Sequence, residues 1–255
     1  MPTKSTDIVI VNYGTGWWLG QCLRSCFYNN GRIEYHGKDN DEFKRLLRET
    51  MKASTTTLVH NGGDDFGLSV AGSMTMHGLT IIDRSKKRIR NYSAGLNAGI
   101  KETKNKYILA MNNDIVLGKD TVEELEKFMD THPTVAMAQP IVTDMYGIMR
   151  PETYVHIKYR CWPEVADEAS YDYLNGCCLM IRRSALEEVG LFDERLMFFE
   201  DADMSYRINK VGLHNRVIPH VSIKHIGSAS VAQFPWRKRI WSNRSRILFF
   251  LKHLW

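Results

Sequence analysis

The chain has 255 residues, of which 44% are hydrophobic and 25% are charged, and its formal net charge is +5. These proportions are typical of a globular protein and exclude a disordered, collagen-like or fibrous chain. No apolar run approaches the ~18 residues of a membrane span, and the N-terminal segment lacks the apolar core of a signal peptide. Five cysteines without a CxxC spacing predict reduced thiols in a cytoplasmic protein.

The residue pattern predicts a series of alternating strands and helices. In chain order these are strand 7–12, helix 17–29, helix 39–52, strand 55–59, strand 79–82, helix 92–101, strand 107–111, a helix capped by Asp120 and ending near Asp130, strand 135–137, strand 179–181, helix 200–211, extended chain over 217–223 and a helical tail over 231–255. Strands alternate with helices through residue 138. This order predicts an α/β fold with a Rossmann-like, mostly parallel central sheet flanked by helices.

Polar clusters follow three of the expected strands: Asn12-Tyr13, His60-Asn61 and Asn112-Asn113-Asp114. In open parallel sheets, ligands bind beyond the carboxyl ends of the strands. The three clusters therefore predict a binding site at one edge of the sheet.

Asn112 and Asp114 leave their strand at alternate positions, so their side chains point the same way. Their oxygen atoms can converge on a hard cation such as Mg²⁺ or Mn²⁺. The alternative interpretation is an ordinary turn rich in Asn and Asp. His225 is of interest as a ligand only if it faces Asp114, and is otherwise a polar filler.

Three carboxylates, Glu200, Asp201 and Asp203, open an expected helix, where the helix dipole favours negative charge. Asp203 can pair with Arg207 at i and i+4, which leaves Glu200 and Asp201 for proton transfer. The alternative is that these acids only cap the helix. The small residues of segment 91–99 either present backbone amides to a phosphate or form a closely packed helix start.

The last 52 residues contain ten lysines or arginines and no carboxylate, whereas the remainder carries a net charge of −5. On a helix, the apolar residues of the tail fall within about 60° of one another, and basic residues surround them: Trp236, Ile240, Ile247, Leu251 and Leu254. This pattern is typical of an interfacial helix on anionic lipid, but a helix packed on the body explains it equally well. A nucleic-acid partner is not expected.

Taken in order, these motifs resemble the family 2 glycosyltransferases with the GT-A fold, and within them the rhamnosyltransferase-like branch. The resemblance covers residues 7–230. Its motifs are Val11-Asn12-Tyr13, the turn 60–63, the helix start 91–99, Asn112-Asn113-Asp114, segment 176–183, Gly190-Leu191-Phe192-Asp193-Glu194, segment 199–204 and, more loosely, His225-Ile226-Gly227-Ser228.

The resemblance implies a role for each matching residue. It implies Asp201 as the catalytic base with Glu200 beside it, and Gly176 and Glu200 on the acceptor side. It implies Asp114, Asn112 and His225 as ligands of Mn²⁺ or Mg²⁺. The residues it places around the donor are Val11, Asn12, Tyr13, His60, Asn61, Asn97, Asn112 and Asn113.

The implied activity is metal-dependent, inverting transfer of a sugar, rhamnose among the candidates, from a UDP-, dTDP- or GDP-sugar to a glycan or lipid-linked acceptor. Residues 1–230 would form one GT-A domain, with a donor-binding half over 1–116 and an acceptor half over 117–230. The basic tail, residues 231–255, would place the enzyme at the cytoplasmic face of an anionic membrane. His60 stands where the family usually has an aspartate that reads the base, so the donor preference stays open.

Two other functions remain compatible with the sequence. A sugar-phosphate nucleotidyltransferase would share the sheet and the metal, but it should carry a basic glycine-rich loop after the first strand, and segment 13–17 has no basic residue. A non-catalytic module that binds nucleotide sugars or glycans would bind without transfer. Asp114 and Asp201 favour the enzyme over this module.

Overall fold

The computed structural model describes residues 5–13, 16–28, 56–61, 79–89, 91–144, 146–148, 173–226 and 235–253. Its elements, in chain order, are β1 (Thr6–Asn12), α1 (Gly16–Tyr28), β2 (Thr56–His60), β3 (Leu79–Asp83), α4 (Tyr92–Lys101), β4 (Tyr107–Asn112), β5 (Ile115–Leu117), α5 (Thr121–Thr131), β6 (Val135–Thr143), β7 (Cys178–Arg182), α6 (Arg183–Val189), α7 (Glu200–Lys210), β8 (His214–His225) and α8 (Pro235–His253). The expected helix 39–52 and the turn residues Gly62 and Gly63 lie outside the described residues.

The eight strands form one sheet in the order β3-β2-β1-β4-β7-β6-β8-β5. The pairs β1·β2, β2·β3, β1·β4 and β6·β8 are parallel, whereas β7 runs antiparallel to β4 and β6, and β5 runs antiparallel to β8. The predicted mostly parallel α/β architecture is therefore confirmed.

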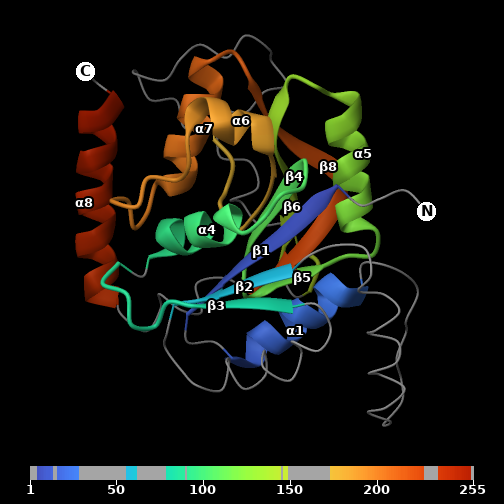
Figure 1. The fold of residues 1–255 in the computed structure, drawn as a ribbon, viewed down its shortest axis with the longest axis horizontal. Helices are drawn as coiled ribbons and strands as arrows, with labels where there is room; N and C mark the ends of the chain where they lie inside the picture. The colour runs from blue at the N-terminus through green and yellow to red at the C-terminus, as the bar shows by residue number, and fades with distance from the viewer. Residues whose placement is uncertain are drawn as a thin grey trace.

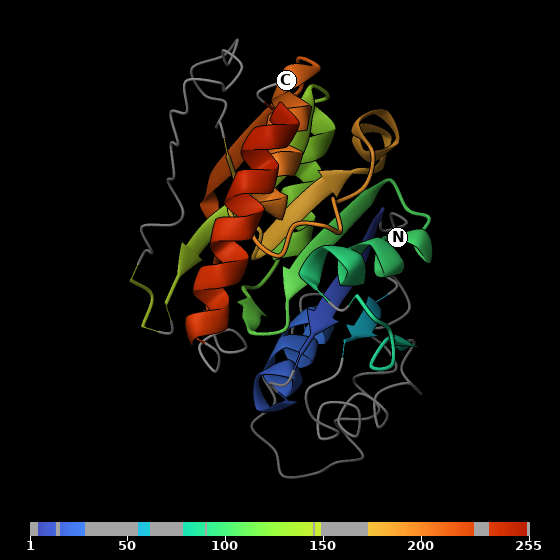
Figure 2. The ribbon, with the colours of Figure 1, turned by 90° about the vertical axis from the view of Figure 1, so that its left-hand side faces the viewer.

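Helices cover both faces of the sheet (Figure 1). Alternate residues of β1 point to opposite faces, as the period of a strand requires: Ile8 and Ile10 belong to the core cluster that includes α1 and α5, whereas Val9 and Val11 belong to the cluster that includes α4, α6 and α7. All of these side chains are nearly inaccessible to water. Helix α8 lies outside the layer of α4, α6 and α7 (Figures 1 and 2).

Strand register brings the polar clusters of the sequence to one edge of the sheet. Asn12 at the end of β1 pairs with His60 at the end of β2, and Val11 pairs with Asn112 at the end of β4. The expected convergence of these three strand ends is confirmed.

The helix start at Asp120 lacks the expected side-chain cap. Asp120 has φ 62°, in the left-handed region, and its side chain makes no capping hydrogen bond. Helix α5 begins at Thr121, as expected after an N-cap at Asp120, and the Thr121 hydroxyl donates to the carbonyl of Gly118 at 2.9 Å. No described helix is long and apolar enough to cross a bilayer.

Candidate active site

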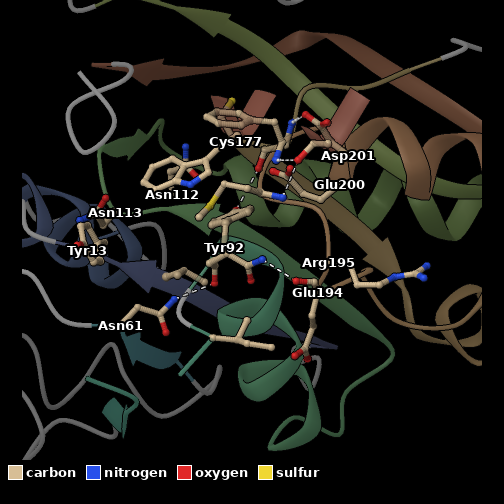
Figure 3. Close-up of a pocket in the computed structure, with 18 of the residues that line it drawn as sticks. Tyr13, Asn61, Tyr92, Asn112, Asn113, Cys177, Glu194, Arg195, Glu200 and Asp201 are labelled. Atoms are coloured by element: carbon tan, nitrogen blue, oxygen red, sulfur yellow. Dashed lines mark hydrogen bonds between the residues drawn. The ribbon is translucent and has the colours of Figure 1, made fainter. Parts of the chain in front are cut away.

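A cavity of about 840 Å³ opens at the carboxyl edge of the sheet. Its lining includes ten of the residues that the sequence singled out: Val11, Tyr13, Asn61, Asn112, Asn113, Asp114, Gly176, Glu200, Asp201 and His225. Figure 3 shows Tyr13, Asn61 and Asn113 at one end of this cavity and Glu200 and Asp201 at the other. The loop after β4 and the start of α7 therefore meet across a single cavity.

Asp114 and His225 form one end of the site. Asp114 lies between β4 and β5, His225 ends β8, and the pairing of β5 with β8 places Ile115 opposite His225. The Oδ1 atom of Asp114 lies 3.3 Å from Nε2 of His225, and their side chains are only 6% and 14% exposed. His225 therefore faces Asp114, as a ligand role requires.

The Asp114–His225 pair suits a divalent cation. A carboxylate oxygen and an imidazole nitrogen are both common ligands of Mn²⁺, and Asn112 lines the same cavity. Among the described residues, no cluster of three or more His, Cys, Asp or Glu side chains can enclose a metal by itself. A cation held by these few side chains would keep coordination positions for phosphate oxygens and water.

A buried polar chain lies next to Asn113, at the end of the cavity opposite Asp201 (Figure 3). Asn12 donates through Nδ2 to Nδ1 of His60 at 3.1 Å, and Asn113 donates to Oδ1 of Asn12. Asn12 and His60 are almost completely buried and are not among the described residues that line the cavity. This chain fixes the side-chain orientation of Asn113, which does line it.

The start of α4 is closely packed. A Cβ atom on Gly95 would lie 2.7 Å from Cγ1 of Val11, so only glycine permits this approach of helix to strand. Asn91 caps α4, with Oδ1 accepting from the amide of Ala94, and its carbonyl accepts from Nδ2 of Asn61 at 3.0 Å. The Asn91 side chain therefore occupies the Ala94 amide, and the helix start packs tightly against β1.

Asn97, expected near the donor, is not among the described residues of the cavity wall. Its Nδ2 donates to the carbonyl of Phe192 at 2.8 Å and to Oε1 of Glu194 at 3.0 Å, and its Oδ1 accepts from the amide of Phe192. Asn97 therefore holds the loop that leads to Glu194, which lines the cavity.

Asp201 is held by three hydrogen bonds at the other end of the site. Its Oδ2 accepts from the amide of Gly176 at 2.9 Å and from the hydroxyl of Tyr173 at 3.1 Å, and its Oδ1 accepts from the amide of Ala202 at 2.8 Å. Burial raises the pKa of the Asp201 carboxyl, and these hydrogen bonds only partly oppose the shift. A raised pKa makes the carboxylate a stronger base than an exposed aspartate.

Glu200 precedes Asp201 and also lines the cavity. Burial and the neighbouring Asp201 charge raise the pKa of Glu200 well above its ordinary value. Its Oε2 is buried and makes no hydrogen bond with the described residues. Two adjacent acids with raised pKa values at one end of a cavity are typical of a proton-transfer site.

Asp203, the third acid of this helix, is occupied elsewhere. It is completely buried, and its Oδ2 lies 2.9 Å from Nη2 of Arg207, which confirms the expected i,i+4 pair. Its Oδ1 lies 2.6 Å from Nζ of Lys252 and 2.8 Å from Nε2 of His253, both on α8. Burial opposes ionisation of Asp203, but the His253 hydrogen bond and the two cations outweigh it and lower its pKa.

Several contributors to the site were not expected from the sequence. Tyr173 directly follows a segment outside the described residues, and no local pattern marks it as a partner of Asp201. Helix α8 forms one wall of the cavity through Arg237, Trp241, Arg244 and Ser245. The spacing of these four residues along one side of a helix is the signal that could have identified that wall.

The profile of the family described as glycosyl transferase family 2 matches residues 7–190. The N-acetylglucosaminyl-diphospho-decaprenol L-rhamnosyltransferases of two Mycobacterium tuberculosis strains, CDC 1551 / Oshkosh and ATCC 25618 / H37Rv, are each 25% identical to this chain over 152 residues. That alignment covers 51% of this chain and 50% of each relative, so the chain matches about half the length of these curated relatives.

Two solved structures share the fold. The mannosyltransferase PcManGT from Pyrobaculum calidifontis, in complex with GDP-Man and Mn²⁺, superposes with a TM-score of 0.68 at 14% identity, covering 100% of this chain and 65% of that protein. S. aureus TarS 1–349 gives a TM-score of 0.65 at 12% identity, covering 94% and 65%. The family match over most of the chain, together with this GT-A fold, shows that the chain belongs to the family 2 glycosyltransferases.

Proposed function

We propose that this chain is an inverting, metal-assisted glycosyltransferase that moves a sugar from a nucleoside-diphosphate donor to an acceptor hydroxyl. One observation carries the proposal: two pairs of residues line the same cavity. Asp114 and His225 come from the loop after β4 and the end of β8, and Glu200 and Asp201 come from the start of α7. A transferase of this kind needs charge stabilisation at the leaving diphosphate and a base near the acceptor hydroxyl.

Asp114 and His225 would hold a divalent cation, Mn²⁺ or Mg²⁺, with Asn112 as a further ligand. When bound, the ion would act as a Lewis acid toward the leaving diphosphate. The 3.3 Å approach of the Asp114 carboxylate to the His225 imidazole supports this role, as does the Mn²⁺ in the solved complex of PcManGT. The GalNAc-T7 structure, which holds UDP, GalNAc and Mn²⁺, offers the same support.

Asp201 would accept the proton of the acceptor hydroxyl while that oxygen attacks the anomeric carbon. The bond between this carbon and the leaving diphosphate breaks in the same displacement, so the configuration inverts and no covalent enzyme intermediate forms. Tyr173 and the Gly176 amide orient the Asp201 carboxylate. Glu200 and Gly176 would contact the acceptor from the same wall.

Residues 1–116 would supply the donor side through Val11, Tyr13, Asn61, Asn112 and Asn113. Residues 117–230 would supply the acceptor side. His225 is the exception, because it lies in this half of the chain but would bind the metal together with Asp114. The solved relatives bind GDP-Man or UDP, so a UDP-, dTDP- or GDP-sugar is the proposed donor class, with rhamnose among the candidate sugars. A glycan or lipid-linked acceptor at the cytoplasmic face of a membrane is proposed because the curated relatives act on a diphospho-decaprenol compound.

The proposal is tested first by donor binding and then by transfer. A thermal-shift panel of UDP, dTDP and GDP with Mn²⁺ should identify one nucleotide that raises Tm, because a ligand of the folded state stabilises it. The matching sugar nucleotide is then incubated with candidate acceptors, and NMR of the product gives its anomeric configuration. Retention of configuration, or release of pyrophosphate from a nucleoside triphosphate and a sugar phosphate, would contradict the proposal.

A further inference from the structure

Helix α8 presents two different faces. Its inner face is fixed to the body: Phe249 is completely buried against Ala202 and Tyr206 of α7. The hydroxyl of Ser245 accepts from the amides of Met197 and Phe198 at 3.0 and 3.3 Å. Together with the contacts of Lys252 and His253 to Asp203, these bonds fix the rotation of the helix about its own axis.

The outer face of α8 carries an apolar stripe, which consists of Trp236, Ile240, Ile247 and Leu251. These side chains are 57–62% exposed. They fall within about 60° of one another on the helix. Because the inner face is anchored, the stripe cannot turn inward. Grouped exposure of this kind marks an interaction surface, whereas single exposed apolar residues do not.

Positive charge borders the stripe on both sides. Arg239 and Arg246 lie along one margin and Arg237 and Arg244 along the other, and all four are exposed. No Asp or Glu occurs anywhere in residues 204–255. A second copy of this helix would therefore bring like charges together, whereas anionic headgroups complement both margins while acyl chains cover the stripe.

The margin formed by Arg237 and Arg244 also lines the cavity that contains Asp201. A bilayer that covered the stripe would therefore lie beside the mouth of this cavity. Its headgroup layer would be level with these two arginines.

We propose that α8 docks the protein on an anionic bilayer, with the stripe in the interfacial layer and the cavity mouth facing the headgroups. If the chain is the proposed transferase, this docking implies that its acceptor is held in the same membrane. Only that implication rests on the proposed function. The docking itself follows from the stripe, its basic margins and the anchored inner face.

The test is flotation of the full chain with vesicles of phosphatidylcholine and phosphatidylglycerol, compared with vesicles of phosphatidylcholine alone. Binding is expected on the anionic vesicles and should weaken at high salt. The variant Ile240→Ser/Ile247→Ser/Leu251→Ser should weaken it at least about tenfold. Arg239→Gln/Arg246→Gln should weaken it about tenfold at low salt.

Ile148→Ser, which changes an equally exposed apolar residue away from α8, is the matched control and should bind as the original chain does. Circular dichroism and Tm check that each variant is folded. The proposal is overturned if the original chain does not bind anionic vesicles, or if the triple-serine variant binds as well as the control. It is also overturned if the stripe instead holds a dimer that the triple-serine variant dissociates. Because flotation requires neither donor nor acceptor, its failure leaves the proposed transferase activity untouched, and a failed transfer assay leaves the docking untouched.

Discussion

Replacing Asp203 by Asn should destabilise the protein strongly, although Asp203 is not the proposed base. The substitution keeps the volume of the side chain but removes the charge that faces Arg207, Lys252 and His253. Breaking a buried ion pair typically costs about 3–5 kcal/mol. The lower end of this range applies to Asp203, because Lys252 would keep a second carboxylate partner, Oδ2 of Asp193 at 3.1 Å.

Arg207 also keeps partners of its own, the carbonyls of Gly190 and Leu191 at 3.0 Å. We therefore expect a loss of about 3 kcal/mol, which corresponds to a decrease in Tm of roughly 6–12 °C for a chain of this size. Thermal unfolding followed by circular dichroism measures the decrease, and hydrogen exchange should show α8 losing protection first.

The pH dependence gives a second measurement on the same variant. The pKa of Asp203 is lowered in the folded protein, so its contribution is complete above its ordinary value of 3.8 and is lost as the pH falls through the lowered value. In Asp203→Asn, the free energy of unfolding should therefore fall less steeply at acid pH than it does in the original chain.

Glu124→Gln removes an exposed partner of Lys127 and serves as the control, for which no resolvable change in Tm is expected. A loss in Asp203→Asn no larger than that of the control would refute the role of Asp203 as the anchor of α8.

The remaining predictions concern the candidate active site. Asp201→Asn should lower kcat at least about 100-fold while the thermal shift by nucleotide and Mn²⁺ persists; normal turnover would remove Asp201 from the mechanism. Tyr173→Phe removes a hydrogen bond that favours the ionised Asp201, so the acid limb of kcat/KM should move to higher pH, and an unchanged profile would argue against this contact. Gly176→Ala would place a Cβ atom 3.2 Å from Oδ2 of Asp201, so kcat should fall with little change in Tm. EDTA should abolish transfer, and added Mn²⁺ or Mg²⁺ should restore it. In the double variant Asp114→Ala/His225→Ala, the added metal should not restore transfer. Full activity in EDTA would refute the metal role.

The sheet was predictable where burial leaves a strong local pattern. The apolar run 8–11 is covered on both faces and was recognised as a buried strand, and the polar residues after β1, β2 and β4 meet because parallel strands end at one edge. The short strand β5 and helix α6 were not predicted. Strand β5 has only three residues, which are too few to show a periodicity. Helix α6 follows β7 directly, and no side chain caps its start.

The candidate site was only partly predictable because much of it depends on tertiary contacts. The sequence indicated Asp114, His225 and Asp201 through motifs. The meeting of Asp114 with His225 depends on the pairing of β5 with β8, which no local pattern specifies. The tail admitted two interpretations, and the structure combines features of both: the helix packs through Phe249, which the amphipathic pattern did not select, while the apolar stripe stays outside.

The buried carboxylate of Asp203 also bears on where this protein can be shortened. A chain cut after residue 230 would retain every side chain proposed for metal binding and proton transfer. It would lose Lys252 and His253, the two partners of Asp203 on α8, together with the phenyl ring of Phe249 over α7 and the wall formed by Trp241. We therefore expect a version trimmed for crystallisation or screening to be destabilised at α7, the helix that carries Asp201, and to need the final helix for a stable fold.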